Sequence, residues 1–420
     1  MIEQFKREEW MNSNRWLKPC LVLLTGLLIS TALVSCSSDD DDSTVGQTEK
    51  LTVGVLLTQS GGMASLGETA LAAVQYAVAD LNASLAGSGK QVRALVGNTE
   101  TDPDIAEAMI GLMQDAEIRI IVGPMSSAEM ERSLGAATDA GILLIGQSST
   151  DPDLAIANDN LFRLVPSDEH QAKAIAAKMY ADGIRYIVST GKVDSWATHL
   201  EAMTVAEFTT LGGTAGEMVV LGEIRDNDFR DSLAVVESMV QAGIDQYGAG
   251  AVAVYMLSFD EGTDILGQAS ELTTLSNVRW YGTDGYVNNN VLFDSTAAAE
   301  FAVAVSFTSP VFVSQDGAKY ESIVGRLEDD FGYTPSIYAV LTYDAVTIAA
   351  NTLLAANGDE DISALRSLLA ATITGTTGAS GTFVLNAAGD RANGGYGFWQ
   401  VEEGGAGGYV WTLAGTSTIE

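Results

Sequence analysis

From residue 51 onward the chain alternates between short apolar segments and longer amphipathic ones, and this alternation constrains the fold more than any other feature. Residues 51–57 are apolar and β-branched, which predicts a buried strand. Ser65 and Glu68 have the spacing of a helix capping box, and apolar residues then recur on one helical face. Further strands are expected near 91–97, 119–122 and 142–145, with helices near 103–116 and 127–140. This spacing predicts parallel strands with helices on both faces of the sheet.

The same alternation resumes after residue 168. We expect helices near 168–182, 195–211, 229–243 and 343–355, and strands near 185–189, 216–220, 250–255 and 278–281. Two α/β lobes joined by several chain crossings fit this length better than a single oversized sheet.

The N-terminus has the pattern of an export signal. Four basic residues within the first 18 positions precede an apolar run at 21–34, which is too short and too interrupted to span a bilayer comfortably. The run ends in Leu-Val-Ser-Cys at 33–36, which resembles a bacterial lipobox and implies cleavage before Cys36 and lipidation of its thiol. An ordinary signal peptide with an incidental cysteine is the alternative. Residues 1–36 are therefore expected to be a lipoprotein signal peptide, and residues 37–50 a flexible acidic tether.

Charge and cysteine content exclude several classes of partner. The formal net charge is −34, from 55 acidic and 21 basic residues, and such a surface repels nucleic acid and anionic lipid headgroups. Contact with a membrane is therefore expected through the lipid anchor only. Cys20 and Cys36 are the only cysteines, so the mature domain has no disulfide and no thiolate metal ligands.

Three loops rich in small and hydroxyl residues follow predicted strands, at 60–62, 123–127 and 146–150. In open α/β sheets, ligands bind beyond the carboxyl ends of the strands, where loops lead into helix N-termini. Ser126 and Glu129 again have capping-box spacing, and the free N–H groups of such a helix favour a carboxylate. The hydroxyls of Ser127 and Thr150 can add donors there. Taken singly, these residues can equally serve as caps and turn formers.

No catalytic constellation is found in the sequence. His170 and His199 are the only histidines, and both lie in predicted helices without metal-ligand spacing. Asp168 and Glu169 follow a proline and indicate a helix start. We therefore predict that the chain is not an enzyme and needs no metal or cofactor.

Several segments resemble type I periplasmic binding proteins, most closely the branched-chain amino-acid (leucine/isoleucine/valine) receptors of ABC transporters. The resemblance covers the chain from about residue 51, in segments 53–67, 122–127, 141–150, 162–163, 281–285, 343–345 and 389–391. It implies two doubly wound parallel-sheet lobes joined by three hinge crossings, near residues 166, 308 and 394. The first lobe would comprise 51–165 plus 309–393, and the second 166–308 plus 394–420.

The resemblance also implies a binding site for an amino acid. The ligand carboxylate would be held by the Ser127 hydroxyl, the backbone of Ser148 and the Thr150 hydroxyl, and the ligand ammonium by Asp284 in the turn Gly-Thr-Asp-Gly. An Asx-turn role is the alternative for Asp284. The cleft would be lined by Leu66, Trp196 and Phe259, where Leu66 replaces a residue that is commonly aromatic in the family.

Taken together, these features predict a monomeric solute-binding lipoprotein of the cell envelope, periplasmic or surface-exposed. It would capture an amino acid or a similar small molecule by hinge closure and deliver it to an ABC permease. A ligand sensor, or a regulator of a cell-envelope enzyme with the same fold, remains the alternative.

Overall fold

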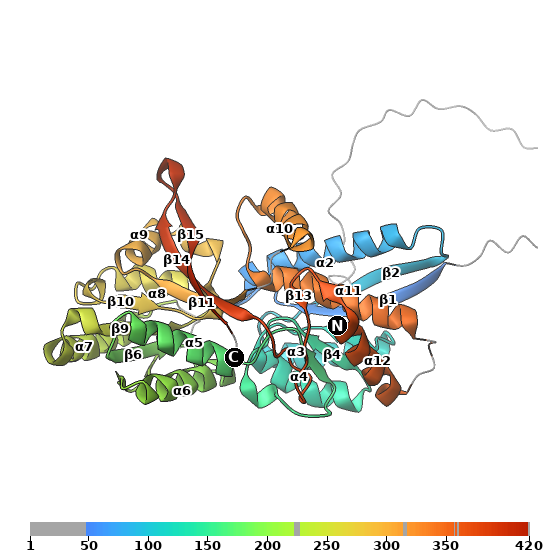
Figure 1. Ribbon diagram of the computed structural model, residues 1–420, viewed down its shortest axis with the longest axis horizontal. Coiled ribbons are helices and arrows are strands. Elements are labelled where there is room, and N and C mark those ends of the chain that lie inside the picture. The colour runs from blue at the N-terminus through green and yellow to red at the C-terminus, as the bar shows by residue number, and fades with distance from the viewer. Residues whose placement is uncertain (1–47, 222–226, 314–316, 357, 359–360, 419–420) are drawn as a thin grey trace, which may run out of the picture. The chain divides into compact units, whose positions relative to one another are not determined.

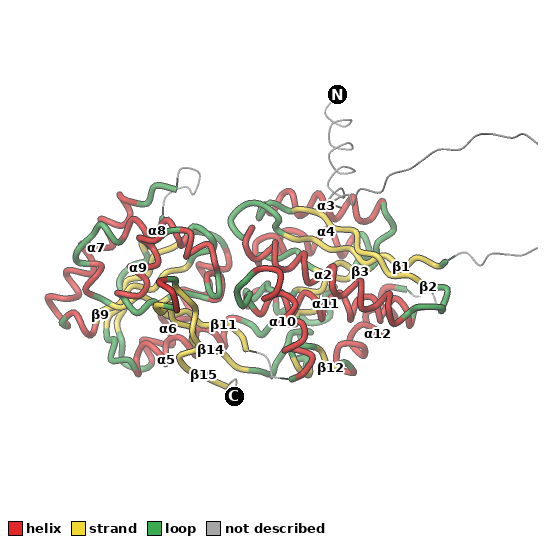
Figure 2. Tube along the Cα trace, turned by 90° about the horizontal axis from the view of Figure 1, so that it is seen from above, coloured by secondary structure: helices red, strands yellow, loops and turns green. Residues whose placement is uncertain are grey.

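Two sheets, each covered by helices on both faces, organise residues 47–420 of the computed structural model into one unit (Figures 1 and 2). The structure describes residues 48–221, 227–313, 317–356, 358 and 361–418. The predicted signal peptide, Cys36 and most of the predicted tether lie outside the described residues.

The first sheet, with its helices here called the first lobe, has five parallel strands in the order β2-β1-β3-β4-β5. Its strands are β1 (Glu49–Leu57), β2 (Lys90–Asn98), β3 (Ile120–Val122), β4 (Leu143–Gly146) and β5 (Leu161–Arg163). Its helices are α2 (Ala64–Ser84), α3 (Pro103–Asp115), α4 (Ser127–Asp139), α10 (Ala318–Phe331), α11 (Ile337–Ala355) and α12 (Ile362–Gly375). Side chains of β1 alternate between two cores, because Val53 and Val55 pack with α2 and α11 whereas Leu56 packs with α3 and α4.

The second sheet, with its helices here called the second lobe, has the order β15-β14-β11-β10-β9-β6-β7, and β8 also pairs with β6. Its strands are β6 (Tyr186–Gly191), β7 (Thr214–Ala215), β8 (Val219–Val220), β9 (Val252–Leu257), β10 (Arg279–Tyr281), β11 (Thr308–Val313), β14 (Gly395–Glu403) and β15 (Tyr409–Thr418). Its helices are α5 (Asp168–Ala181), α6 (Ser195–Thr210), α7 (Arg230–Tyr247), α8 (Gly262–Ala269) and α9 (Thr296–Ala304). Strand β14 pairs antiparallel with both β11 and β15, and β14 and β15 form a hairpin at one edge. A separate two-stranded pair, β12 (Thr377–Gly378) and β13 (Gly381–Thr382), precedes this hairpin.

The predicted fold class, two doubly wound α/β lobes, is confirmed. The chain passes between the two sheets three times, after β5, after β11 and before β14. The predicted division at residue 308 cuts through β11, whereas β11 pairs along its whole length with β14 in the second sheet. This crossing therefore follows Val313, because backbone pairing holds the strand in the second lobe. The other lobe boundaries stay predictions.

Two local expectations differ from the structure. The N-cap of α2 is Met63 and has no side-chain cap, so the capping box expected at Ser65 and Glu68 is wrong. The elements that were not predicted are helices α8, α9, α10 and α12, strands β5 and β11, the pair β12–β13 and the hairpin β14–β15. In the described part of the chain, α11 is the one helix long and apolar enough to cross a membrane. Most of its residues are buried against α2 and the first sheet, as in the core helix of a globular lobe.

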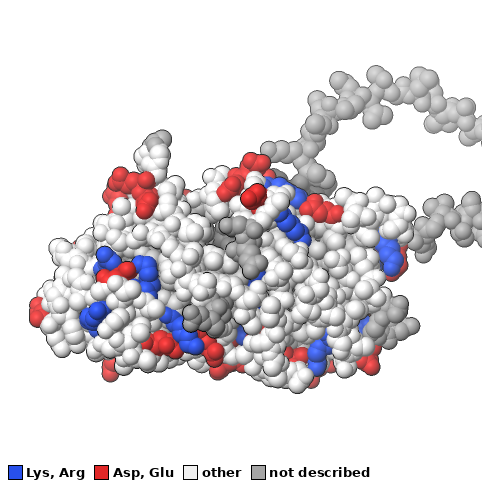
Figure 3. Space-filling view, in the orientation of Figure 1, with Lys and Arg blue, Asp and Glu red and all other residues white. Residues whose placement is uncertain are grey.

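Charged side chains on the face shown in Figure 3 lie in small separate groups, with acidic and basic residues near one another. The acidic excess of the sequence is therefore not gathered into a single patch on this face.

Candidate ligand-binding site

The start of α4 and the loop after β4 are joined by hydrogen bonds to the Ser127 hydroxyl. Ser126 caps α4 with the predicted capping box, since its Oγ accepts from the Glu129 N–H at 3.3 Å and the Glu129 carboxylate accepts from the Ser126 N–H at 2.9 Å. The Ser127 Oγ accepts hydrogen bonds from the backbone N–H groups of Thr150 and Asp151, each at 3.2 Å. The first turn of α4 thereby fixes the predicted carboxylate-binding loop.

Ser148 and Thr150, the other two predicted carboxylate ligands, are also buried in this region. The Ser148 hydroxyl donates to the carbonyl oxygen of Met125 at 2.8 Å. The Thr150 hydroxyl donates to the carboxylate of Asp168 at 2.8 Å. The structure therefore places Ser127, Ser148 and Thr150 in one buried region, and their contact with a ligand stays a prediction.

A chain of hydrogen bonds leads from Thr150 to Asp284. The Gln171 side-chain amide donates to Asp168 at 2.6 Å and to Asp284 at 2.9 Å, and its oxygen accepts from the Asp284 N–H at 2.9 Å. The Tyr338 hydroxyl, at the start of α11, donates to the other carboxylate oxygen of Asp284. Asp284 thus contacts both lobes, because Gln171 belongs to α5 and Tyr338 to α11.

The carboxyl groups of Asp168 and Asp284 lie in an environment that disfavours charge. Burial raises the pKa of Asp284, while the hydrogen bonds from Tyr338 and Gln171 oppose that rise. Burial also raises the pKa of Asp168 well above its usual range, and the negative charge of Asp284 adds to this. In the described part of the chain, neither carboxylate forms an ion pair with Lys, Arg or His. A cation that entered the site would favour the charged form of both groups.

The two predicted aromatic residues lie against the Asp284 turn. The rings of Trp196 and Phe259 stack with their centroids 4.8 Å apart and an interplanar angle of 22°. A Cβ added to Gly285 would lie 2.8 Å from the Phe259 ring and 2.9 Å from the Trp196 ring, so only glycine fits there. Leu66 is buried in the same apolar cluster as this aromatic pair.

Asp260, which was not predicted, connects the two lobes on one side of the site. Its carboxylate accepts hydrogen bonds from the Ser65 hydroxyl at 2.5 Å, from the Ser65 N–H at 3.0 Å and from the Asn289 amide at 2.6 Å. Its own N–H donates to the carbonyl oxygen of Gly62 at 2.9 Å. Because Ser65 lies in the first turn of α2, this carboxylate from the second lobe supplies the cap that α2 lacks in its own sequence.

His199, on α6, connects the lobes at a second place. Its Nδ1 lies 3.0 Å from the carboxylate of Asp151, and its Nε2 lies 3.6 Å from that of Asp153. These side chains present ligand atoms within 4.8 Å of one another and so have the composition of a metal site. The hydrogen bond to Asp151 raises the pKa of His199, which makes an ion pair the simplest account of the cluster.

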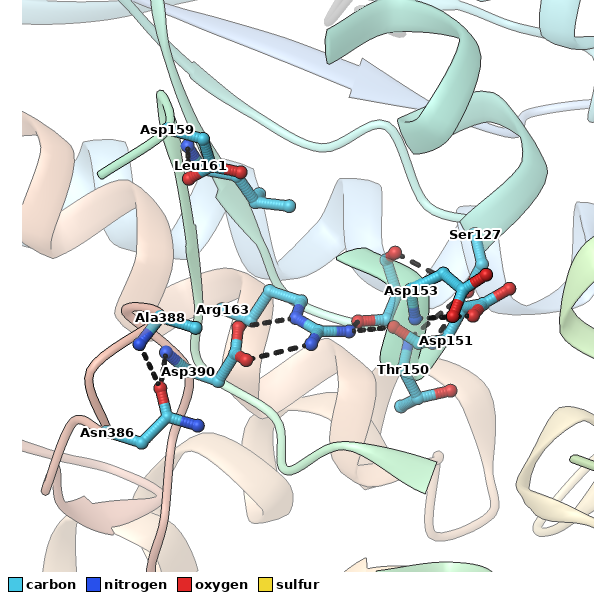
Figure 4. A network of polar contacts seen from close by, with 11 residues as sticks. Ser127, Thr150, Asp151, Asp153, Asp159, Leu161, Arg163, Asn386, Ala388 and Asp390 are labelled. Carbon is cyan, nitrogen blue, oxygen red and sulfur yellow. Dashed lines mark hydrogen bonds and ion pairs between the residues drawn. The ribbon is translucent and has the colours of Figure 1, made fainter. Parts of the chain in front are cut away.

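Arg163, on β5, fixes the loop after β4, which contains Thr150 and Asp151 (Figure 4). Its guanidinium makes two bonds to the Asp390 carboxylate, at 2.6 and 2.9 Å, and donates to the carbonyl oxygen of Asp151 at 2.6 Å. Arg163 and Asp390 belong to the two separate sequence segments, 162–163 and 389–391, on which part of the resemblance rests. The structure shows why both segments matter, since together they anchor the loop that carries Thr150.

Sequence reasoning missed Asp168, Gln171 and Tyr338. Asp168 was correctly placed at a helix start, since α5 begins there. A signal was available for Gln171, because residues three apart in the first turn of a helix lie on one face. Tyr338 offers no comparable local pattern.

Comparisons with known proteins agree with this architecture. A family model described as periplasmic binding protein matches residues 50–406. An uncharacterized protein of Methanocaldococcus jannaschii is 25% identical over 411 residues, covering 91% of this chain and 94% of that protein. The substrate-binding protein LivJ of a branched-chain amino acid transporter from Streptococcus pneumoniae, solved with isoleucine, is similar in structure with a TM-score of 0.71. It is 21% identical, and the match covers 88% of this chain and 99% of that chain. A solute-binding protein of an ABC transporter from R. palustris, solved with benzoate, has a TM-score of 0.72, 18% identity and coverages of 88% and 97%.

Proposed function

The chain belongs to the periplasmic binding protein family, and from this premise we propose that it captures an amino acid between its two lobes and delivers it to an ABC transporter. The similar structures include an amino-acid complex and a benzoate complex, so the family fold alone does not decide between a zwitterion and a simple acid.

The observation that carries the choice of an amino acid is the environment of Asp284. This carboxyl group is buried beside Asp168, and no basic residue in the described chain pairs with either. An isolated charge in such surroundings is costly, whereas a ligand ammonium would supply a charge-assisted partner. A ligand that carries only a carboxylate would add a third acid to the site without neutralising the first two.

The carboxylate of the ligand is assigned to the opposite wall. The N-terminus of α4 offers backbone N–H groups and the positive end of the helix dipole, and the hydroxyls of Ser127 and Thr150 lie beside it. The backbone of Ser148 borders the same loop. A zwitterion would then lie between the two walls, with Leu66, Trp196 and Phe259 around its side chain.

Hinge closure is the proposed mechanism. The first lobe carries Ser127 and Thr150, and the second carries Asp284, Trp196 and Phe259, so neither lobe alone completes the site. The ligand would favour the closed arrangement because only that arrangement brings both ends of the zwitterion into contact with the protein. The bonds at Asp260 and His199 would then hold the two lobes together.

The location follows from the N-terminal segment together with the family. We propose that residues 1–36 are a lipoprotein signal peptide, that Cys36 carries the lipid, and that the monomeric binding unit is tethered outside the cytoplasm. Mass spectrometry of the membrane-extracted protein should show a diacylglyceryl modification at Cys36. An unmodified cysteine would contradict the anchor but not the binding function.

A matched pair of ligands tests the proposed function directly. We expect L-leucine, or another amino acid of a full panel, to raise the melting temperature in a concentration-dependent way, since a ligand of the native state stabilises it. The deaminated analogue, 4-methylpentanoate in the case of L-leucine, should have no such effect. Asp284→Asn should weaken amino-acid binding by about 30-fold or more, the usual scale for removing one partner of a buried charge pair. Asp228→Asn, at a side chain that is 57% exposed, is the control. Equal binding of the analogue, or full affinity in Asp284→Asn, would refute the proposal.

A further inference from the structure

Glu261 presents a buried carboxylate oxygen that has no partner in the described structure. The residue is 6% exposed and follows β9, just before α8. One of its carboxylate oxygens, Oε1, accepts a hydrogen bond from the Phe259 N–H at 3.0 Å. The other, Oε2, has no hydrogen-bond partner. A buried acceptor left in this state costs free energy, which points to a donor that comes from outside the protein.

The free oxygen of Glu261 lies close to Gly62 of the first lobe, where the two lobes are in contact. A Cβ added to Gly62 would lie 3.9 Å from Oε2 and 3.8 Å from one edge of the Phe259 ring, while the other edge of that ring faces Gly285. Phe259 therefore stands between the Asp284 turn and Glu261. Trp196 stacks on the Phe259 ring and Lys192 Nζ lies 3.6 Å over its centre, so a ligand side chain that runs from Asp284 toward this oxygen would take the place of one of them.

The charged groups near Glu261 do not pair with its free oxygen, Oε2. Lys192 is the nearby cation, but its Nζ pairs with Asp194 at 2.9 Å and lies 3.6 Å over the centre of the Phe259 ring. No ion pair joins Lys192 to Glu261 in the described residues. Burial raises the pKa of Glu261, while Lys192 lowers it. Asp260, the adjacent acid, already accepts three hydrogen bonds.

We propose that Glu261 is a specificity-determining residue that selects amino acids whose side chain ends in a hydrogen-bond donor, an ammonium or a carboxamide. This inference rests on the proposed function, because it assumes that the α-ammonium is bound at Asp284. It differs from the aliphatic preference that the resemblance to branched-chain receptors implies. A purely aliphatic side chain would leave Oε2 buried without a partner, and a side-chain carboxylate would place two acceptors face to face.

Four ligands of similar length test the proposal by isothermal titration calorimetry on the purified protein. L-Ornithine and L-glutamine carry a distal donor, L-norvaline carries none, and L-glutamate carries an acceptor. We expect ornithine or glutamine to bind about 10- to 100-fold more tightly than norvaline, the usual range for a hydrogen bond to a charged group, and glutamate to bind most weakly. Glu261→Gln retains an oxygen for the Phe259 N–H and should fold normally. It should lose about 10-fold or more in affinity for the favoured ligand and leave norvaline unchanged. Glu271→Gln, at a side chain that is 63% exposed, is the matched control.

The outcomes separate this inference from the proposed function. Norvaline or leucine binding more tightly than both donor ligands, with Glu261→Gln without effect and Asp284→Asn disruptive, would overturn the role of Glu261 and leave the amino-acid site intact. Binding of no amino acid at all would overturn both.

Discussion

Removing the Asp390 carboxylate should destabilise the protein more than most single substitutions. Arg163 is 0% exposed and Asp390 is 1% exposed, and two short bonds join them. In Asp390→Ala the guanidinium would stay buried with only its bonds to the carbonyl oxygens of Asp151 and Ser149. Breaking a buried pair by removing one partner costs about 3–5 kcal/mol, because an uncompensated charge remains inside the protein.

Chemical unfolding measures this cost. The free energy of unfolding from guanidinium titration should fall by about 3–5 kcal/mol in Asp390→Ala. Arg132→Ala is the control, because its pairs with Asp104 and Glu107 are exposed and should be worth less than about 1 kcal/mol. The double variant Arg163→Met with Asp390→Leu should recover much of the loss, since an apolar pair leaves no buried charge.

The same substitution should also disturb ligand binding, since Arg163 holds the carbonyl oxygen of Asp151 beside the loop that carries Thr150. The reasoning is refuted if Asp390→Ala costs no more than Arg132→Ala, because the guanidinium would then have another partner or access to water.

Two further predictions concern the contacts between the lobes. Asp260→Ala removes the cap that the second lobe supplies to α2 at Ser65. Amino-acid affinity should therefore fall by about 5- to 30-fold, mainly because the ligand dissociates faster, which stopped-flow measurements would detect. An unchanged dissociation rate would show that the contact does not hold the closed form. His199 has a raised pKa because of its hydrogen bond to Asp151 and the charges of Asp153 and Glu131, so its stabilising contribution should be complete below pH ~6.5 and disappear as the pH rises through the raised pKa. His199→Gln should therefore lower the unfolding free energy at pH 6 and leave it nearly unchanged at pH 9, and an equal loss at both values would contradict this.

The fold was predictable because its signals are local. Most strands and helices of the first half show their own periodicity, although the short strand β5 was not predicted, and the capping box of Ser126 and Glu129 lies within four residues. This capping box forms as the sequence indicates, whereas the one expected at Ser65 and Glu68 does not. The chain crossing that follows Val313 was predicted at residue 308. The error arose because β11 is largely buried and would fit either sheet, and only its pairing with β14 assigns it to the second sheet.

The hydrogen-bond network of the site was less predictable because its partners are distant in sequence. Gln171 and Asp284 are 113 residues apart, and Arg163 and Asp390 are 227 residues apart. The resemblance indicated Asp284 as one end of this network. It did not indicate that Gln171 joins Asp284 to Asp168, and so it did not reveal that two acids share one buried environment.

The start of α2, where the predicted capping box of Ser65 and Glu68 does not form, bears most directly on function. Ser65 and Glu68 satisfy the spacing rule for a capping box, yet the acceptor that α2 uses is Asp260, 195 residues away. A helix N-terminus that is capped within its own sequence has no need of another lobe. Because α2 lacks such a cap, the Ser65 N–H depends on Asp260 when the lobes meet, and we expect water to take this place when they separate. The cap at Ser65 therefore forms only when the lobes meet, and its loss in Asp260→Ala should destabilise the closed state, whereas loss of the bond from Asn289 acts within the second lobe in either state.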